Sequence, residues 1–266
     1  MTASRDQDYL LNKQYKDAVN FNARVELHRR FSINKSNWQH WVFDQLQLDA
    51  GSTILELGCG PGWLWRGNRE RIPASWQITL SDFSAGMLDE TRQQLGEERF
   101  AYQVADAQAL PFGDASFDAV IANHMLYHVP DLSKALEEIK RVLKPGGHFY
   151  ASTVGREHLR ELDELLYRAQ VSPHWQNFKQ NAPFVLENGQ EVLAPVFEQV
   201  KLHIYDDALE VTEAEPLIAY ALSGKLGQTI NPEKREALTT LVEQEVAAHG
   251  AIHITKVSGM FEARKE

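Results

Sequence analysis

Residues 54–62 read Ile-Leu-Glu-Leu-Gly-Cys-Gly-Pro-Gly, a short apolar run followed by glycines at every second position. The apolar run, taken from Thr53 to Leu57, predicts a buried strand, and a helical pattern begins directly after Gly62. In an open parallel sheet, ligands bind beyond the carboxyl ends of the strands, at strand–loop–helix connections of this kind. Glycine lets backbone approach a ligand closely and adopt positive φ angles. We therefore expect Gly58 and Gly60 to line a ligand site.

The rest of the chain alternates strand and helix patterns around this stretch. We expect further strands at 77–81, 100–104, 117–122, 148–153, 200–205 and within 252–264, and helices at 84–95, 132–143 and from Pro232 to about His249. Strands separated by helix-length segments predict right-handed crossovers and a doubly wound, mostly parallel α/β sheet. We expect the core to comprise 50–155 and 196–266, with an N-terminal helical lid at 1–49 and a helical cap insertion at 156–195.

Composition narrows the class of protein. The 266 residues carry a net charge of -10, and 43% are hydrophobic. A negative chain repels a phosphate backbone, so we expect no nucleic-acid partner. Cys59 is the single cysteine, which excludes an internal disulfide. The polar first residues and the lack of a membrane-length apolar run predict a cytoplasmic protein without a membrane span. A homodimer is compatible with the sequence, which leaves the oligomeric state open.

Three residues near the glycine loop indicate a nucleoside-type ligand. Dinucleotide-binding folds place a third glycine where this chain has Trp63, and a bulky indole there argues against a pyrophosphate. Asp82 closes the second predicted strand, where a carboxylate can accept hydrogen bonds from both ribose hydroxyls. Asp106 closes the third predicted strand and could accept from an adenine amino group. A glycine turn alone could be only a tight connection, but the two acids at strand ends favour a binding site.

Five motifs in order give the segment 53–154 a specific family resemblance. They are Glu56-Leu-Gly-Cys-Gly-Pro-Gly62, Asp82-Phe-Ser-Ala-Gly-Met87, Ala105-Asp-Ala-Gln-Ala-Leu-Pro-Phe112, Phe117-Asp-Ala-Val120 and Arg141-Val-Leu-Lys-Pro-Gly-Gly147. The segment resembles the catalytic core of class I S-adenosylmethionine-dependent methyltransferases, in the small-molecule branch that includes the quinone-biosynthesis enzymes. The resemblance implies a Rossmann-like, seven-stranded sheet whose antiparallel C-terminal strand Gly259–Ala263 could supply. The N-terminal 50 residues and the 156–195 insertion inherit no role from it.

The resemblance also implies a set of cofactor contacts for S-adenosylmethionine. The backbone of Gly58–Gly60 would follow the methionine part, and Asp82 would bind the ribose. The adenine would lie between Phe83 and Met87, with its edge at Asp106 and Ala107. Asn123 and His124 would line the methionine end. Tyr15 and Arg24 are expected as lid contacts on their residue types and not from the resemblance. With them, the full expected set of cofactor contacts is Tyr15, Arg24, Glu56, Gly58, Cys59, Gly60, Asp82, Phe83, Met87, Asp106, Ala107, Gln108, Asn123 and His124.

Two histidines past the fourth predicted strand are the candidate catalytic residues. Methyl transfer from a sulfonium depends mostly on holding the acceptor in line, and a base helps when the acceptor carries a proton. If the segment Asn123-His-Met-Leu-Tyr-His128 turned helically, His124 and His128 would lie on one side. Either imidazole could serve as a base, or both could simply pack. A metal site here lacks a third ligand nearby, so we expect none.

Recognition of the acceptor falls to the predicted cap. Its aromatic residues are Tyr15, Phe21, Trp38, Trp41, Phe43, Trp175 and Phe178, which could wall a small-molecule site or pack the cap on the sheet. Tyr15 and Arg24 are the expected lid contacts, and a guanidinium could hold the methionine carboxylate. The run Asp206–Glu215 has five acids and no base. We interpret it as a solvated turn, with attraction of a cationic acceptor as the alternative.

Three other functions compete with methyl transfer to a small-molecule acceptor, at oxygen or nitrogen. A nicotinamide-dependent oxidoreductase conflicts with Trp63. A non-catalytic module that binds the cofactor is disfavoured by the intact loop and by both acids, although fold alone does not prove function. Methylation of RNA is opposed by the acidic balance, and the motif Asn-Pro-Pro-Tyr is absent after the fourth predicted strand, where Asn123-His-Met-Leu stands.

Overall fold

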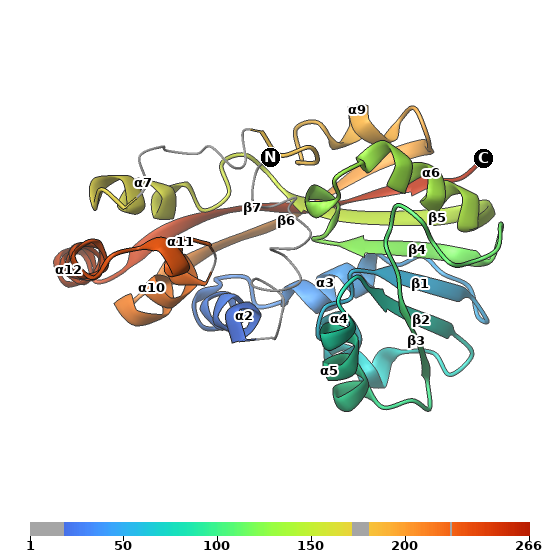
Figure 1. The fold of residues 1–266 in the computed structure, drawn as a ribbon, viewed down its shortest axis with the longest axis horizontal. Helices are drawn as coiled ribbons and strands as arrows, with labels where there is room; N and C mark the ends of the chain where they lie inside the picture. The colour runs from blue at the N-terminus through green and yellow to red at the C-terminus, as the bar shows by residue number, and fades with distance from the viewer. Residues whose placement is uncertain (1–18, 172–180, 224) are drawn as a thin grey trace.

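A seven-stranded sheet organises the computed structural model, which describes residues 19–171, 181–223 and 225–266 (Figure 1). The strands are β1 (Thr53–Leu57), β2 (Gln77–Asp82), β3 (Phe100–Val104), β4 (Phe117–Asn123), β5 (Leu143–Val154), β6 (Glu198–Val211) and β7 (Ile252–Arg264). Their order is β3-β2-β1-β4-β5-β7-β6. Neighbours from β3 to β5 pair in parallel, and β7 pairs antiparallel with both β5 and β6. The predicted Rossmann-like sheet with one antiparallel C-terminal strand is confirmed.

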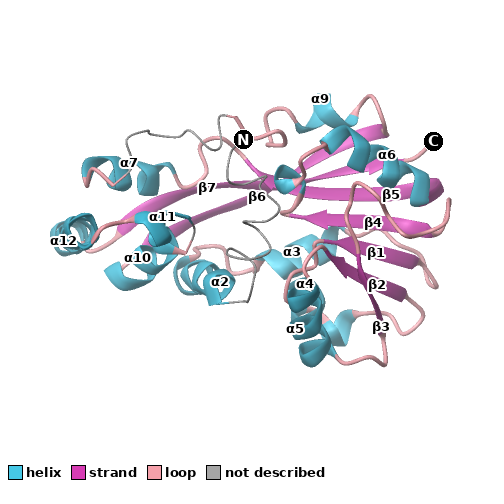
Figure 2. Cartoon of the chain, viewed as in Figure 1, coloured by secondary structure: helices cyan, strands magenta, loops and turns pink. Residues whose placement is uncertain are grey.

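Helices cover both faces of the parallel strands (Figure 2). One face packs against α6 (Leu132–Val142) and α9 (Gly189–Leu193), and the other against α3 (Trp38–Gln45), α4 (Trp63–Gly67) and α5 (Ala85–Leu95). Successive residues of a strand point to opposite faces, so Leu55 joins the α6 side and Ile54 joins the α3 side. This double cover explains why β1 and β4 are nearly continuous apolar runs.

A second group of helices surrounds the far ends of β6 and β7, which extend well beyond the parallel strands (Figure 1). We call this group the distal lobe. It contains α2 (Val19–Phe31), α7 (Arg160–Arg168), α10 (Ala214–Leu222), α11 (Lys225–Thr229) and α12 (Pro232–His249). Its own hydrophobic core includes Leu27, Leu162, Leu217, Leu238 and Ile254. The lobe therefore has a packing centre separate from those on the two faces of the parallel sheet.

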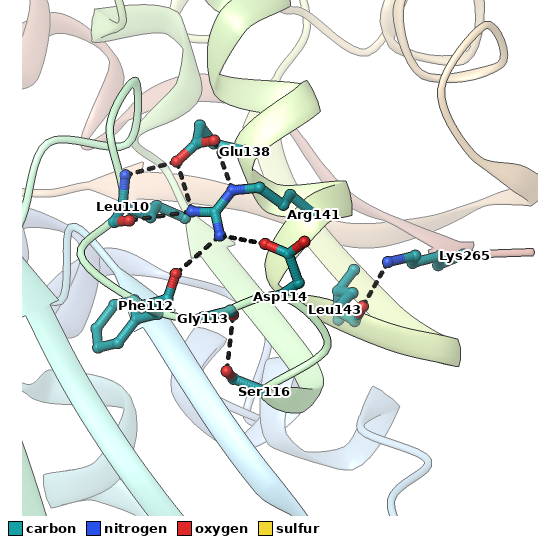
Figure 3. Close-up of polar contacts among 9 residues, drawn as sticks. All are labelled: Leu110, Phe112, Gly113, Asp114, Ser116, Glu138, Arg141, Leu143 and Lys265. Carbon is teal, nitrogen blue, oxygen red and sulfur yellow. Dashed lines mark hydrogen bonds and ion pairs between the residues drawn. The ribbon is translucent and has the colours of Figure 1, made fainter.

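Arg141 of α6 fixes the connection between β3 and β4 (Figure 3). Its guanidinium donates to the carboxylates of Glu138 and Asp114 and to the carbonyl oxygens of Leu110 and Phe112, at 2.8–3.0 Å. Five N–H donors in a planar fork suit this arrangement, which a lysine could not reproduce. Arg141, which belongs to the last of the five motifs, thus stabilises the loop that follows Asp106.

Most predicted elements form, with differences at their ends. Helix α12 begins after Asn231, whose side chain accepts from the Lys234 backbone N–H, and it ends at His249 as expected. The expected helix 132–143 ends at Val142, because Leu143 already pairs with Phe117 as the start of β5. The register between β4 and β5 then shifts, which accommodates the Lys144–Gly147 stretch within the strand. Residues 252–264 form one long strand.

The packing of individual elements bears on how the chain is divided. Helix α3, from the N-terminal 49 residues, packs on the sheet through Val42 and Phe43, and α9 packs on the opposite face through Leu193. Helices α10 to α12, from the 196–266 segment, lie in the distal lobe. We propose that the division of the chain into lid and core follows the hydrophobic cluster that each element joins, either on a face of the parallel sheet or in the distal lobe. Among the described residues, none of the helices has the length and apolar character that crossing a bilayer requires.

Candidate functional site

The glycine loop forms an open turn at the carboxyl end of β1. Gly58, Gly60 and Gly62 all have positive φ angles, +63°, +53° and +73°. A Cβ on Gly60 would meet no atom within 4 Å, whereas one on Gly62 would lie 2.7 Å from Thr91 Cγ2. Gly60 therefore leaves its surroundings open for a ligand, and Gly62 allows close packing against α5. A Cβ on Gly58 would lie 2.9 Å from Met125 Cβ, so this glycine serves packing.

Asp82, at the end of β2, lies beside this loop. Its Oδ2 accepts the Gly60 N–H at 3.0 Å and its Oδ1 accepts the Ser84 N–H at 2.8 Å. Each carboxylate oxygen has two lone pairs, so both can accept further bonds from a ligand. Burial raises the pKa of the Asp82 carboxyl, and the backbone donors oppose that rise. An open glycine with a partly exposed carboxylate beside it fits a nucleoside sugar.

Two other loop residues face the protein interior. Glu56 is 2% exposed, and its Oε2 accepts the Trp65 indole N–H at 2.6 Å. Burial raises the pKa of Glu56 to about 8, so its carboxyl is mostly protonated at neutral pH. Cys59 is buried, and burial raises the pKa of its thiol. Any contact of Glu56 or Cys59 with a cofactor stays a prediction.

The two expected adenine neighbours differ in accessibility. Phe83 is partly exposed next to Asp82. Met87 is 2% exposed, and its backbone N–H caps α5 by donating to Ser84 Oγ. Met87 thus offers almost no surface to a ligand in this structure. Its role as an adenine contact stays a prediction, while Phe83 has the exposed surface that such a contact requires.

Asp106 lies in a tight turn just after β3. Its carboxylate accepts the backbone N–H of Gln108 at 2.9 Å and the side-chain amide of Gln108 at 3.0 and 3.1 Å. The amide oxygen of Gln108 in turn accepts the Asp131 N–H at 3.1 Å, and Ala107 is buried. The turn is therefore rigid, and Gln108 must share the Asp106 carboxylate with any adenine amino group.

Asn123 and His124 follow β4 in a constrained geometry. The Oδ1 of Asn123 accepts from Ser152 Oγ at 2.5 Å and from the Trp38 indole N–H at 3.2 Å. The His124 backbone N–H donates to Ser152 Oγ at 2.9 Å. His124 has φ +54°, a left-handed conformation that is uncommon for histidine. Such strain clusters at functional sites.

His124 and His128 are not successive positions of one helical face. The left-handed backbone at His124 prevents an α-helix, and only a short 3₁₀ turn, η4, forms at Leu126–His128. Leu126 is fully buried in the turn, and the His128 ring lies 4.6 Å from the Tyr127 ring. The helical spacing expected from the sequence is therefore wrong for this pair. A catalytic role of either histidine stays a prediction.

Aromatic rings from two elements, α3 and β6, form a cluster beside His124. The Trp38 ring lies 4.7 Å from the His124 ring and 5.1 Å from that of Trp41, both centroid to centroid. Tyr205 of β6 packs against both indoles, at 5.2 and 5.3 Å. Trp38 and Trp41 therefore border the site, although the periodicity of α3 alone could not distinguish this from core packing.

A buried ion pair beyond the aromatic rings was missed by the sequence reasoning. Asp207 of β6 contacts Lys256 of β7, which faces it in the strand register. Asp207 therefore lies in a strand, and the expected solvated turn is wrong for this residue. The run of acids does not indicate that Asp207 pairs with Lys256. The alternation of apolar and polar residues in β6 and β7 is the sequence signal that could have indicated it.

His28 of α2 is a further unexpected neighbour. Its Nδ1 is buried without a hydrogen-bond partner among the described residues. Its ring lies 5.7 Å from Tyr220 and 6.4 Å from His158, both in or next to the distal lobe. Burial, and then the charge of Lys256, lowers the pKa of His28 to about 3. Nothing in the local sequence of α2 distinguishes His28 from a surface histidine.

The expected lid contacts are placed differently or fall outside the description. Arg24 of α2 donates from Nε to Ser223 Oγ of the distal lobe at 2.8 Å. Its role at a methionine carboxylate therefore stays a prediction. Tyr15, Trp175 and Phe178 lie outside the described residues.

Comparison with known proteins agrees with this geometry. Residues 55–151, which span β1 to most of β5, match the family described as "Methyltransferase domain". A malonyl-[acyl-carrier protein] O-methyltransferase of Erwinia billingiae is 41% identical over 115 residues, 42% of this chain and 43% of that protein. A ubiquinone/menaquinone biosynthesis C-methyltransferase of Desulfotalea psychrophila is 36% identical over 110 residues, 41% of this chain and 44% of that protein. The chain thus matches less than half the length of these relatives.

Solved structures show the same fold over a longer stretch. Phosphoethanolamine N-methyltransferase 2 of Haemonchus contortus, in complex with S-adenosyl-L-methionine, aligns with a TM-score of 0.61 at 19% identity. The alignment covers 100% of this chain and 60% of that one. The sheet and the loop thus define a Rossmann-like methyltransferase fold. Residues 55–151 are a class I S-adenosylmethionine-dependent methyltransferase domain, which confirms the resemblance of the five motifs.

Proposed function

We propose that this chain transfers a methyl group from S-adenosylmethionine to a small-molecule acceptor. The observation that carries the proposal is the open backbone at Gly60 beside the Asp82 carboxylate. This pair supplies a turn that a ligand can approach and an acceptor for sugar hydroxyls. The relatives named above act on different acceptors, so their names support the reaction class more than a particular substrate.

Each part of the site has a role in this proposal. Gly60 and Asp82 hold the nucleoside, Phe83 contacts the base, and Asn123 with His124 border the reacting end. When bound, S-adenosylmethionine supplies an activated methyl group on a sulfonium sulfur. The chain's own contribution is then to orient the acceptor and exclude water, which can supply much of the acceleration. Trp38 restricts the space around His124 on the side of α3.

His124 is suited to accept a hydrogen bond from the acceptor. Burial, and secondarily the charge of Lys256, lowers the pKa of His124 to about 4, so its imidazole is neutral at neutral pH. A neutral imidazole has a free nitrogen lone pair for a hydroxyl or amine proton. The bond from its backbone N–H to Ser152 keeps the residue at the end of β4.

Isothermal titration calorimetry with S-adenosylhomocysteine tests the cofactor site directly. We expect wild-type protein to bind S-adenosylhomocysteine and not NAD. Asp82→Asn keeps the shape but removes the charge, and hydrogen bonds to charged groups contribute about 1.5–3 kcal/mol. We therefore expect affinity to fall at least about tenfold.

Asp118→Asn is the matched control for this measurement. Asp118 is also a bonded aspartate of the sheet, but it lies near the start of β4, where it accepts from Thr53 and Lys144. We expect the affinity of this variant for S-adenosylhomocysteine to equal that of the wild type. Undiminished binding by Asp82→Asn, or no heat with the wild type, would contradict the proposed site.

A further inference from the structure

The ion pair between Asp207 and Lys256 is almost completely enclosed. The Asp207 side chain is 0% exposed and that of Lys256 is 8% exposed. Asp207 also accepts from Ser32 Oγ at 2.5 Å and from the Asn34 N–H at 3.0 Å. These bonds fix the carboxylate from the segment between α2 and α3. A buried pair is costly to desolvate and often adds little net stability, so its retention requires another reason.

The pair lies at the same edge of the sheet as His124. Strand β7 runs antiparallel to β5, and Ser258 faces Val154 at the end of β5. Lys256 comes two residues before Ser258 in β7. Because β7 runs antiparallel to β5, Lys256 lies beyond the carboxyl ends of the parallel strands. Its Nζ lies 5.2 Å from the centroid of the Tyr205 ring. The rings of Tyr205, Trp38 and His124 then follow one another at 5.2 and 4.7 Å.

Four charged or titratable groups face this region from different elements. They are Lys256 of β7, Asp207 of β6, His28 of α2 and His124 after β4. The charge of Lys256 lowers the pKa of His28, and the charge of Asp207 raises it and so partly offsets this effect. In the part of the chain that the structure describes, Lys256 is the one charge that lowers the pKa of the His124 imidazole. Lys256 therefore contributes a positive potential beside His124, which disfavours a cation there and favours an anion.

We propose that the acceptor is an oxygen acid, a phenol or a carboxylic acid, and that Lys256 selects it over an amine. The proposal rests on the proposed methyl transfer and narrows its acceptor class. Lys256 acts across the aromatic rings as a specificity-determining residue. Its pairing with Asp207 holds the ammonium in place, and the enclosed surroundings screen its charge less than water would.

The two kinds of oxygen acid differ in their need for a base. A carboxylate attacks directly, forming the O–CH₃ bond as the S–CH₃ bond breaks and leaving a neutral thioether. A phenol makes the same exchange and also loses its O–H proton to water, while the neutral His124 imidazole accepts a hydrogen bond that positions the hydroxyl. His124→Gln should therefore slow methylation of a phenol strongly and that of a carboxylic acid little.

A titration without any ligand measures the field of Lys256. In ¹⁵N-labelled wild-type protein, the imidazole shifts of His124 should report a pKa near 4. In the double variant Asp207→Asn/Lys256→Met, we expect this pKa to rise by about 1 or more, a tenfold change in protonation. The neutral pair preserves the shape of the site, and the amide oxygen introduced by Asp207→Asn can still accept from the Asn34 N–H. Lys256→Arg, which keeps the charge, should keep the low pKa.

Lys144→Met is the matched control. Lys144 also pairs with an aspartate, Asp118, at 2.8 Å, but near the start of β4 at the opposite edge of the sheet. The pKa of His124 should be unchanged in this variant. An unchanged pKa in the double variant, or an equal rise in Lys144→Met, would overturn the role of Lys256.

Probe binding to wild-type protein tests the acceptor class itself. The protein is saturated with S-adenosylhomocysteine and titrated with 4-nitrophenol, benzoate and benzylamine, an amine that is protonated at neutral pH. We expect the two oxygen acids to bind at least tenfold more tightly than the amine. We also expect bound 4-nitrophenol to ionise at a lower pH than free 4-nitrophenol, as its visible absorbance reports. Preferential binding of the amine, binding of neither oxygen acid, or an unshifted ionisation would overturn the proposal.

Failure of this inference is distinguishable from failure of the proposed function. Calorimetry with S-adenosylhomocysteine alone reports the cofactor site and does not involve Lys256. If that ligand binds and the amine is preferred, methyl transfer stands and the acceptor class is wrong. If that ligand does not bind, the methyl-transfer proposal itself fails.

Discussion

His124 combines a strained backbone with a restrained side chain. The left-handed conformation costs roughly 1 kcal/mol for a residue with a Cβ, and it persists because Ser152 holds the backbone N–H and the tilted Trp38 ring packs against the imidazole. Both restraints act on the end of β4, where a parallel sheet presents its ligand site. The left-handed turn at His124 therefore ends β4 without continuing into an α-helix.

The depressed pKa of His124 makes the stability of the protein depend on pH. Folded His124 takes up a proton near pH 4, whereas the unfolded residue does so near its ordinary pKa of 6.5. The unfolded state thus binds more protons between these values, so the contribution is complete above pH 6.5 and is lost as the pH falls toward 4. Relative to His124→Gln, the wild type should lose up to about 1.4 kcal/mol of unfolding free energy per pH unit.

Urea unfolding from about pH 7 to about pH 4 measures this difference. The comparison between variants is needed because the raised pKa of Glu56 contributes the opposite slope as the pH rises from 4.5 toward 8. His249→Gln is the control, since the His249 side chain is 68% exposed. Parallel stability curves for the wild type and His124→Gln would show that the imidazole is not held neutral.

At the scale of single residues, the sequence predicts the position of a residue when neighbouring residues determine it, and fails when tertiary packing does. The places of Gly60 and Asp82 in the fold could be predicted, because Gly60 lies in the loop after one recognisable strand and Asp82 ends the next. The inward-facing Met87 could not, because a residue three positions after an N-cap faces inward or outward according to tertiary packing. The pair between Asp207 and Lys256 depends on antiparallel register across a long helical excursion, which no local pattern records.

The loop between β1 and α4 separates two uses of glycine within five residues. Gly62 begins α4 in a left-handed conformation and lets α5 approach through Thr91 and Leu95. Gly60 has the same backbone requirement but open surroundings. The element thus has one glycine for helix packing and one for access, although the sequence shows only the shared spacing.

Alanine substitutions should separate these two uses. Gly62→Ala places a Cβ 2.7 Å from Thr91 Cγ2 and 2.9 Å from Leu95 Cδ1, so it combines backbone strain with overpacking. We expect it to lower the unfolding free energy by about 2–4 kcal/mol. Gly60→Ala should cost only the strain, about 1 kcal/mol, and should weaken binding of S-adenosylhomocysteine at least tenfold.

Gly250→Ala is the control for strain alone, because Gly250 has φ +80° and a Cβ there would meet no atom within 4 Å. Thermal unfolding and calorimetry on the three variants supply both readouts. A Gly60→Ala variant with unchanged affinity would place the ligand elsewhere.

The secondary elements themselves were largely predictable, since buried strands and capped helices have local signals. The residues at which these helices and strands begin and end were less predictable. The expected helical arrangement after β4 fails because Leu126 is drawn into the core and His124 turns left-handed. The end of α6 moves by one residue because Leu143 finds a strand partner in Phe117, a contact made by tertiary structure alone.

At the scale of the whole molecule, β6 and β7 connect two packing centres. Their near halves complete the sheet beside β5, and their far halves carry the distal lobe (Figure 1). Arg24 of α2 contacts Ser223 after α10, which are 199 positions apart. Contacts at such separations carry no local sequence signal, so the expected lid at 1–49 and cap at 156–195 stay predictions.

Two leucine truncations should distinguish the packing centres. Leu238 of α12 and Leu55 of β1 are both fully buried, and replacing either with alanine should cost about 2–5 kcal/mol. In Leu238→Ala we expect faster hydrogen exchange in α10, α12 and the far ends of β6 and β7, with β1 and β4 still protected.

The affinity of Leu238→Ala for S-adenosylhomocysteine should change less than about threefold, because the glycine loop is packed elsewhere. Leu55→Ala should instead raise exchange throughout the parallel strands. Equal exchange profiles for the two variants would show that the molecule unfolds as one cooperative unit.

Val211 and Ile252 are partners in the register of β6 and β7, so the chain departs into α10, α11 and α12 and returns at a single point. An excursion of this kind can be lengthened, shortened or exchanged between relatives while the strands on either side keep their alignment. The length of this excursion can therefore change without moving the register that places Asp207 opposite Lys256.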